Sequence, residues 1–152
     1  MSEQEQHVET FVAFAKGSNW ATNVKIIDTE WTIQVDEPTD DGGTNTGPNP
    51  MQYFAASLAS CQNEQAQVVA EELELKIDGI DIKLEIDLDL SGFMGMADNS
   101  KSCYKAVRLE AIVSGNLNDN QIIELGAKVD ARCPVLELLR ASGCLISSTW
   151  RK

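Results

Sequence analysis

The chain has 152 residues, a length typical of one domain with its own hydrophobic core. Hydrophobic residues make up 43% and charged residues 24% of the sequence, which is globular composition and excludes a disordered chain. Against 12 lysines and arginines stand 24 aspartates and glutamates, and the net charge of −12 disfavours binding to nucleic acid or an anionic membrane.

No apolar segment approaches the roughly 18 residues that a membrane-spanning helix needs. The first residues, Met1 to Gln6, have neither the basic start nor the apolar stretch of a signal peptide. We therefore expect a cytoplasmic protein whose residues 1–152 form one domain. The G-x-G-x-x-G and G-x-x-x-x-G-K-[ST] motifs do not occur, so the sequence predicts no nucleotide cofactor.

The N-terminal third predicts three strands and a long loop. Residues 7–15, 22–27 and 30–35 are rich in β-branched and aromatic residues, and a turn is expected at residues 17–19. Residues 36–50 contain many Gly, Pro, Asn and Asp residues and predict a loop. Loops of this length are often functional, although a plain surface connection explains the composition equally well.

A long helix is predicted over residues 51–72, which lack Gly and Pro and are rich in Ala, Leu, Gln and Glu. Asn49 suits the N-cap and Pro50 the first helical position. One apolar stripe of this helix contains Phe54, Leu58 and Cys61. Its spacing predicts that the Cys61 side chain faces the core.

The C-terminal half predicts two long strands, two helices and a last strand. Residues 80–90 alternate between apolar and charged side chains, the pattern of a half-buried strand, and residues 104–114 form the second strand. Residues 119–130 have a helical period, and a cysteine–proline pair begins another helix over residues 133–141. Residues 144–150 predict a short final strand.

The side chains available for chemistry are few. The single histidine, His7, lies near a polar terminus, where we expect a solvated role. One histidine and no C-x-x-C motif disfavour a zinc site, a Ser-His-Asp triad and a thioredoxin-type motif, so we expect no metal. The candidates that remain are Cys61, Cys103, Cys133 and Cys144.

These cysteines have different predicted settings. Cys61, on its apolar stripe, is either an inert core residue or a reactive thiol, because free cysteine is among the most buried residues. Cys133 begins a helix, where unsatisfied backbone amides and the helix dipole favour a thiolate. The alternative is a helix cap that happens to be cysteine. Cys103 and Cys144 are expected to be structural or incidental.

Two motifs resemble the signatures of the OsmC/Ohr family. The first runs from Gly47 to Cys61, with a G-x-N-P lead-in, an alanine-rich helix start and a cysteine eleven residues after Pro50. The second is the C-P-V sequence that begins at Cys133, 72 residues after Cys61. The resemblance extends from about Phe11 to the last predicted strand.

The resemblance implies an α+β fold in which antiparallel sheets wrap two long central helices of an intertwined homodimer. The implied activity is thiol-dependent reduction of hydroperoxides, organic ones preferred. In that mechanism Cys61 is peroxidatic, attacks the O–O bond and becomes a sulfenic acid. Cys133 is the resolving cysteine and closes a disulfide, which a dithiol reductant, lipoyl or other, then opens.

The sequence departs from the family's pattern around this expected site. Met51 stands where the family's peroxidases usually carry glutamate, and no arginine precedes Arg108. Lys16, Lys25 and Arg108 are the candidates to replace the family's N-terminal arginine. A buried thiol without a nearby cation has a raised pKa and is a weaker nucleophile. In this respect the chain resembles a branch of the family that has methionine in place of the glutamate.

The sequence leaves three functions open. The first is a two-cysteine thiol peroxidase that uses Cys61 and Cys133. The second is a dimer without robust peroxidase activity that senses redox state or binds an apolar ligand. The third is an oligomer whose thiols are merely buried and do not react with peroxide until the protein unfolds.

Overall fold

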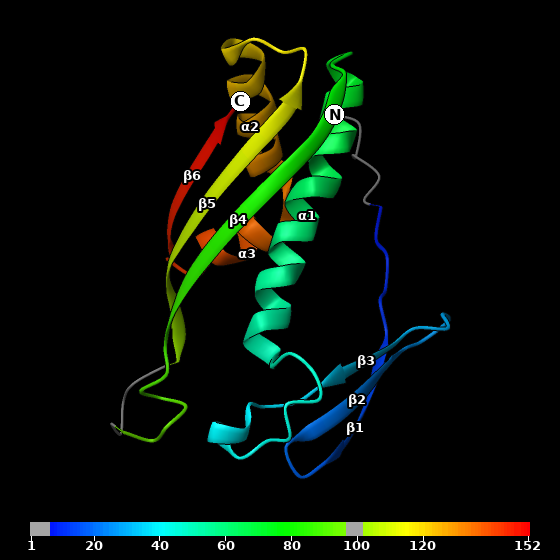
Figure 1. Ribbon diagram of the computed structural model, residues 1–152, viewed down its shortest axis with the longest axis vertical. Helices are drawn as coiled ribbons and strands as arrows, with labels where there is room; N and C mark the ends of the chain where they lie inside the picture. The colour runs from blue at the N-terminus through cyan, green and yellow to red at the C-terminus, as the bar shows by residue number, and fades with distance from the viewer. Residues whose placement is uncertain (1–6, 97–101) are drawn as a thin grey trace, which may run out of the picture. The chain divides into compact units, whose positions relative to one another are not determined.

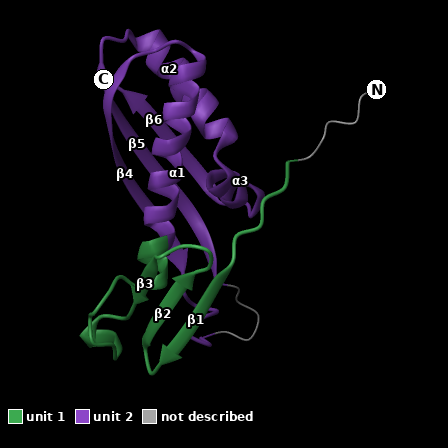
Figure 2. Ribbon diagram, turned by 90° about the vertical axis from the view of Figure 1, so that its right-hand side faces the viewer, with its two compact units in different colours: residues 1–53 green, residues 54–152 purple. Residues whose placement is uncertain are grey.

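The computed structural model describes residues 7–96 and 102–152. The chain divides into two compact units, residues 1–53 and residues 54–152 (Figure 2). In the described ranges, no helix has the length and apolar character needed to cross a lipid bilayer.

The first unit contains an antiparallel sheet of three strands in the order β1-β2-β3 (Figure 1). The strands are β1 (Ala13–Ser18), β2 (Ala21–Ile26) and β3 (Thr32–Val35). The first strand was predicted over residues 7–15, but it lies later because its pairing with β2 runs from Ala13 to Ser18. The turn is correspondingly tighter than predicted and contains Asn19, whose φ of 55° suits asparagine.

The loop after β3 is organised around the buried carboxylate of Asp36. Five hydrogen bonds reach this carboxylate, from the backbone amides of Glu37, Thr44 and Thr46 and from both threonine hydroxyls. These bonds, the Thr44 hydroxyl foremost, hold the pKa of Asp36 well below its usual range. At Gly43 a Cβ atom would lie 1.9 Å from the Glu37 carbonyl oxygen, so this loop path requires glycine.

Two helices begin with a side-chain cap of the same kind. Before α1 (Pro50–Glu72), Asn49 Oδ1 accepts from the Gln52 amide and Gln52 Oε1 accepts from the Asn49 amide, both at 2.9 Å. Asn118 and Gln121 make the same capping box before α2 (Asp119–Arg132). A short 3-10 helix, η1 (Thr39–Asp41), precedes α1 within the loop.

The second unit places its helices on one face of a three-stranded sheet (Figure 2). The strands are β4 (Ile77–Asp89), β5 (Cys103–Gly115) and β6 (Leu145–Arg151), in the order β4-β5-β6. β4 and β5 are antiparallel, whereas β6 is parallel to β5, so this sheet is mixed. A parallel neighbour requires a crossover, which α2 and α3 (Pro134–Ala141) provide.

The core of the second unit consists of two clusters. The α2 cluster joins the C-terminal half of α1 to β5 and α2, and its buried residues are Ala66, Val69, Ala70, Val113, Leu117, Ile122, Leu125 and Val129. The cysteine cluster joins the first half of α1 to β5 and α3, and its buried residues are Leu58, Val107, Cys133, Leu136, Leu139 and Cys144. The architecture is the mixed α+β class that the sequence predicted.

Candidate functional site

Cys61 and Cys133 meet in the cysteine cluster. The Sγ of Cys133 lies 3.0 Å from the Sγ of Cys61, although 72 residues of sequence separate them. Cys61 is half-buried on α1, and Cys133 is completely buried between α2 and α3. The two sulfur atoms are about 1 Å farther apart than in a disulfide bond, so a small movement would allow them to bond.

A backbone amide at the start of α3 contacts the sulfur of Cys61, whereas the sequence predicted such a contact for Cys133. Cys133 is the N-cap residue of α3, but its side chain makes no capping hydrogen bond. The Val135 backbone amide, in the first turn of α3, donates instead to the Cys61 sulfur and lowers the pKa of Cys61. The Cys133 thiol is directed toward Cys61, so the thiolate-stabilising contact expected for Cys133 belongs to Cys61.

The net effect of its surroundings is to keep Cys61 protonated. Burial, the hydrogen bond with Cys133 and the nearby charge of Glu64 raise the pKa of Cys61 from 9.0 to about 11, against the opposing Val135 amide. Among the described residues, no lysine or arginine is one of the main influences on this pKa. The Cys61 thiol is therefore a weak nucleophile in the single chain.

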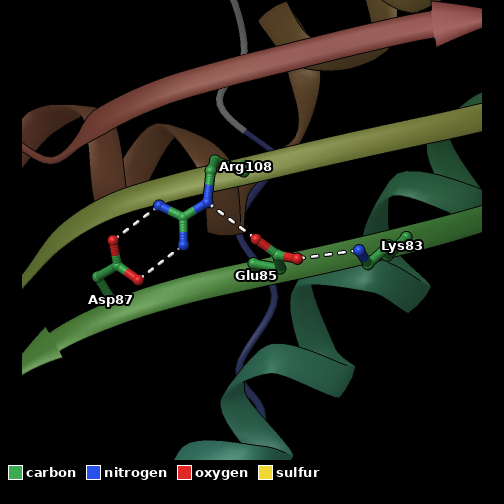
Figure 3. A network of polar contacts seen from close by, with 4 residues as sticks. All are labelled: Lys83, Glu85, Asp87 and Arg108. Atoms are coloured by element: carbon green, nitrogen blue, oxygen red, sulfur yellow. Dashed lines mark hydrogen bonds and ion pairs between the residues drawn. The ribbon is translucent and has the colours of Figure 1, made fainter.

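Arg108, one candidate for an activating cation, lies on the opposite face of the sheet. Its Nη1 and Nη2 atoms each donate to Asp87 at 2.7 Å, and its Nε donates to Glu85 at 3.0 Å (Figure 3). Val107, the preceding residue of β5, is buried in the cysteine cluster. Because successive side chains of a strand point to opposite faces, Arg108 points away from the Cys61 of its own chain.

The two lysines that are candidate cations, and Met51, belong to the first unit. Lys16 lies on β1 and Lys25 on β2, both exposed, and they remain the candidate cations. Met51 is 44% exposed and the first turn of α1 carries no acidic residue. The exposed His7 contacts Glu9, as expected of a solvated histidine.

Aromatic and aliphatic side chains surround the sulfur pair. The rings of Phe54 and Tyr104 stack and pack against the cysteine cluster. Burial raises the pKa of the Tyr104 phenol, which therefore stays neutral. The site is thus largely apolar, a setting that suits a ligand with a hydrocarbon part.

The two other cysteines have different environments. Cys144 is buried in the cysteine cluster, and its thiol donates to the Leu145 carbonyl at 3.8 Å. Burial, followed by the charges of Asp87 and Cys103, raises the pKa of Cys144. Cys103 is half-buried at the start of β5 and contacts the Lys105 side chain. Their expected structural or incidental role stays a prediction.

The sequence analysis did not single out Gln62, the residue after Cys61. Gln62 is completely buried, and neither polar atom of its side chain has a hydrogen-bond partner among residues 7–96 and 102–152. The available signal was a polar residue one helical turn from both Leu58 and Ala66 on a buried stripe. In the same ranges, no group of three or more His, Cys, Asp or Glu residues is placed to hold a metal ion.

A family model described as OsmC-like protein matches residues 43–148. The chain therefore belongs to the OsmC-like protein family, as its motifs predicted. A comparison with curated protein sequences finds no match.

Solved structures of this family share the fold. The organic hydroperoxide resistance protein OsmC of Legionella pneumophila, also described as a predicted redox protein, is 24% identical, with a TM-score of 0.74 over 94% of this chain and 97% of its own. An organic hydroperoxide resistance protein of Elizabethkingia anophelis is 21% identical, with a TM-score of 0.75 over 95% of this chain and 96% of its own. OhrB of Bacillus subtilis, an organic hydroperoxide resistance protein, is 23% identical, with a TM-score of 0.68 over 95% and 98%.

Proposed function

We propose that the protein reduces organic hydroperoxides by a two-cysteine mechanism, with Cys61 as the peroxidatic and Cys133 as the resolving residue. The observation that carries this proposal is the 3.0 Å distance between their sulfur atoms. Membership of the OsmC-like family supports it, as do structural neighbours named for organic hydroperoxide resistance.

The reaction consists of two displacements, the first on an oxygen of the hydroperoxide and the second on the sulfur of Cys61. The Cys61 thiolate attacks the hydroperoxide, so an S–O bond forms, the O–O bond breaks and the alcohol leaves after taking up a proton. The Cys133 thiol then attacks the Cys61 sulfenic acid, so the S–S bond forms and the oxygen leaves as water. Two thiols lose two electrons in total, and a dithiol reductant, lipoyl or other, returns them by thiol–disulfide exchange.

The surroundings of the sulfur pair support an organic substrate. The Phe54 and Tyr104 rings and the aliphatic residues of the cysteine cluster supply apolar surface for a hydrocarbon group. Hydrogen peroxide gains nothing from such surface, because it has no hydrocarbon part. We therefore expect the protein to react faster with organic hydroperoxides than with hydrogen peroxide.

We propose further that the chain acts as a homodimer of single OsmC-like domains in the cytoplasm. The first unit leaves several large apolar side chains more than half exposed: Val8, Phe11, Phe14, Trp20 and Trp31. Exposed apolar surface of this extent is typical of an interaction site, and a second copy of the chain is the partner that the family's architecture implies.

One observation favours a second function, a redox sensor without rapid turnover. The pKa of Cys61 near 11 leaves little thiolate at neutral pH, and Arg108 is bound to carboxylates on the far face of the sheet. A slow thiol would still form the Cys61–Cys133 disulfide when peroxide accumulates. In this function the protein would be oxidised once and would not cycle.

The decisive experiment is stopped-flow consumption of cumene hydroperoxide and hydrogen peroxide, with free thiols counted before and after. The proposed mechanism predicts that two thiols per chain are lost, and that turnover with a dithiol disappears in Cys61→Ser. Cys103→Ser, a matched change outside the sulfur pair, should leave turnover unchanged.

Unchanged turnover in Cys61→Ser would refute the peroxidase mechanism. A single stoichiometric oxidation that dithiol does not turn into a cycle would instead establish the sensor.

A further inference from the structure

Among the described residues, two polar or charged side chains are buried, and they differ sharply in their surroundings. Asp36 accepts five hydrogen bonds. Gln62 is 0% exposed, yet its Nε2 and Oε1 atoms have no partner in the described ranges. Burying an amide without a hydrogen-bond partner destabilises the folded protein, so an unpaired amide in a core requires a physical reason.

The position of Gln62 connects it to the sulfur pair. It follows Cys61 directly and lies one helical turn after Leu58, which packs in the cysteine cluster with Cys133. Side chains three and four residues apart are neighbours on a helix surface, so Cys61 and Gln62 each lie next to Leu58 on α1. Ala66, one turn further, belongs to the α2 cluster, so Gln62 lies between the two clusters.

The burial of Gln62 limits what its partner can be. Because one chain alone covers this side chain completely, a second copy or another protein has no access to it. Inside a core, the usual partner of such a polar group is a small one, a water molecule or a group of similar size. The proposed reaction brings one such group to the residue before Gln62, the oxygen atom that arrives on the Cys61 sulfur.

We propose that the Gln62 amide binds the oxygen that passes from the hydroperoxide to Cys61 and then leaves as water, an inference that rests on the proposed function. The Nε2–H donates to the sulfenic oxygen, and Oε1 accepts its proton. When the Cys133 thiol attacks, the S–S bond forms, the S–O bond breaks, and the oxygen leaves as water with the proton of the Cys133 thiol. The apolar side chains of the cysteine cluster supply no such hydrogen bonds.

The test separates the two chemical steps in the full-length protein. Reduced protein is mixed with cumene hydroperoxide, the Cys61 sulfenic acid is trapped with dimedone at successive times, and disulfide formation is followed by mass spectrometry. Gln62→Met keeps a similar unbranched shape without the amide. We expect it to slow disulfide closure about 10- to 100-fold and to prolong the dimedone-reactive state, with little effect on sulfenic acid formation.

Gln67→Met is the matched control, because Gln67 lies exposed on the same helix. It should close its disulfide at the wild-type rate, and equal slowing in both variants would overturn the proposal. Gln62→Leu serves as a second apolar variant. Closure at the wild-type rate in either folded Gln62 variant would overturn the proposal, because a structural amide has no reason to act on that step.

Failure of both Gln62 variants to fold would also overturn it, since it would show that the amide is needed by the protein itself. If wild-type protein forms no Cys61–Cys133 disulfide with peroxide, the proposed function fails instead, before any Gln62 variant is compared. The two failures are therefore distinguishable.

Discussion

The rings of Phe54 and Tyr104 stack with their centroids 4.7 Å apart and their planes inclined by 15°. Phe54 belongs to α1, the helix that carries Cys61, and Tyr104 belongs to β5, so the stack connects this helix to the sheet. Both rings pack against the cysteine cluster. Aromatic pairs of this kind contribute about 1 kcal/mol beyond the area that they bury.

Phe54→Ala tests whether this aromatic surface selects the substrate. We expect the rate with cumene hydroperoxide to fall about tenfold, because the loss of apolar contacts in a binding pocket is worth about 1–3 kcal/mol. The rate with hydrogen peroxide should change little. Tyr104→Phe keeps the stacked ring and should keep the selectivity. Stopped-flow rates with both peroxides check this, and an equal fall for the two would contradict it.

The pH dependence of Cys61 reactivity follows from its raised pKa. The thiolate is the reactive form, so a pKa near 11 in place of 9.0 makes the rate rise with pH, about tenfold per pH unit, until it levels near 11. Cys133→Ala removes a hydrogen bond that raises this pKa and should shift the inflection to lower pH. Alkylation rates of Cys61 across pH, with the peptide identified by mass spectrometry, measure both. A plateau at neutral pH would contradict the prediction.

Asp36→Asn should lower the melting temperature by several degrees. The five hydrogen-bond donors around Asp36 share its two carboxylate oxygens. An asparagine side chain would offer them one acceptor oxygen. The pKa of Asp36 is lower in the folded protein than its ordinary 3.8, so its stabilisation is present above that value and is lost as the pH falls below it. The difference between the variant and wild type should therefore shrink on acidification. Asp40→Asn, an exposed change in η1, is the control for thermal melts, and an equal loss there would refute this account.

Gly126→Ala should destabilise the protein although alanine favours helices. A Cβ atom at Gly126 would lie 2.3 Å from Cγ of Trp150, near the base of the indole side chain, where it cannot swing away. Overpacking costs about 1–3 kcal/mol and outweighs the gain in helix propensity of about 1 kcal/mol. In a Trp150→Ala background the same substitution should no longer destabilise. Urea unfolding of the four proteins tests this, and additive effects would contradict a direct clash.

The periodicity of the sequence was sufficient to predict the elements of the second unit. The alternation over residues 80–90 corresponds to β4, and the stretch without Gly or Pro after Asn49 corresponds to α1. Periodicity predicts which face of an element is buried, but it does not predict its neighbour. The parallel pairing of β6 with β5 was therefore outside its reach, and β1 could be placed only by its pairing with β2.

The candidate site was accessible from the sequence only in part. The family motifs pointed to Cys61 and Cys133, but residues so far apart in sequence come together through tertiary packing alone. Pro134 correctly predicted the start of a helix, yet the sequence could not show that a backbone amide of its first turn contacts Cys61. Gln62 was hidden for a similar reason, because a polar residue on a buried stripe reveals its unpaired state only when the surrounding atoms are known.

Cys133 is both the C-cap residue of α2 and the N-cap residue of α3, so it is the single residue between the two helices. A shift of its backbone toward α1 would be shared by the C-terminal turn of one helix and the N-terminal turn of the other. Formation of the proposed Cys61–Cys133 disulfide would therefore act on the ends of both helices at once.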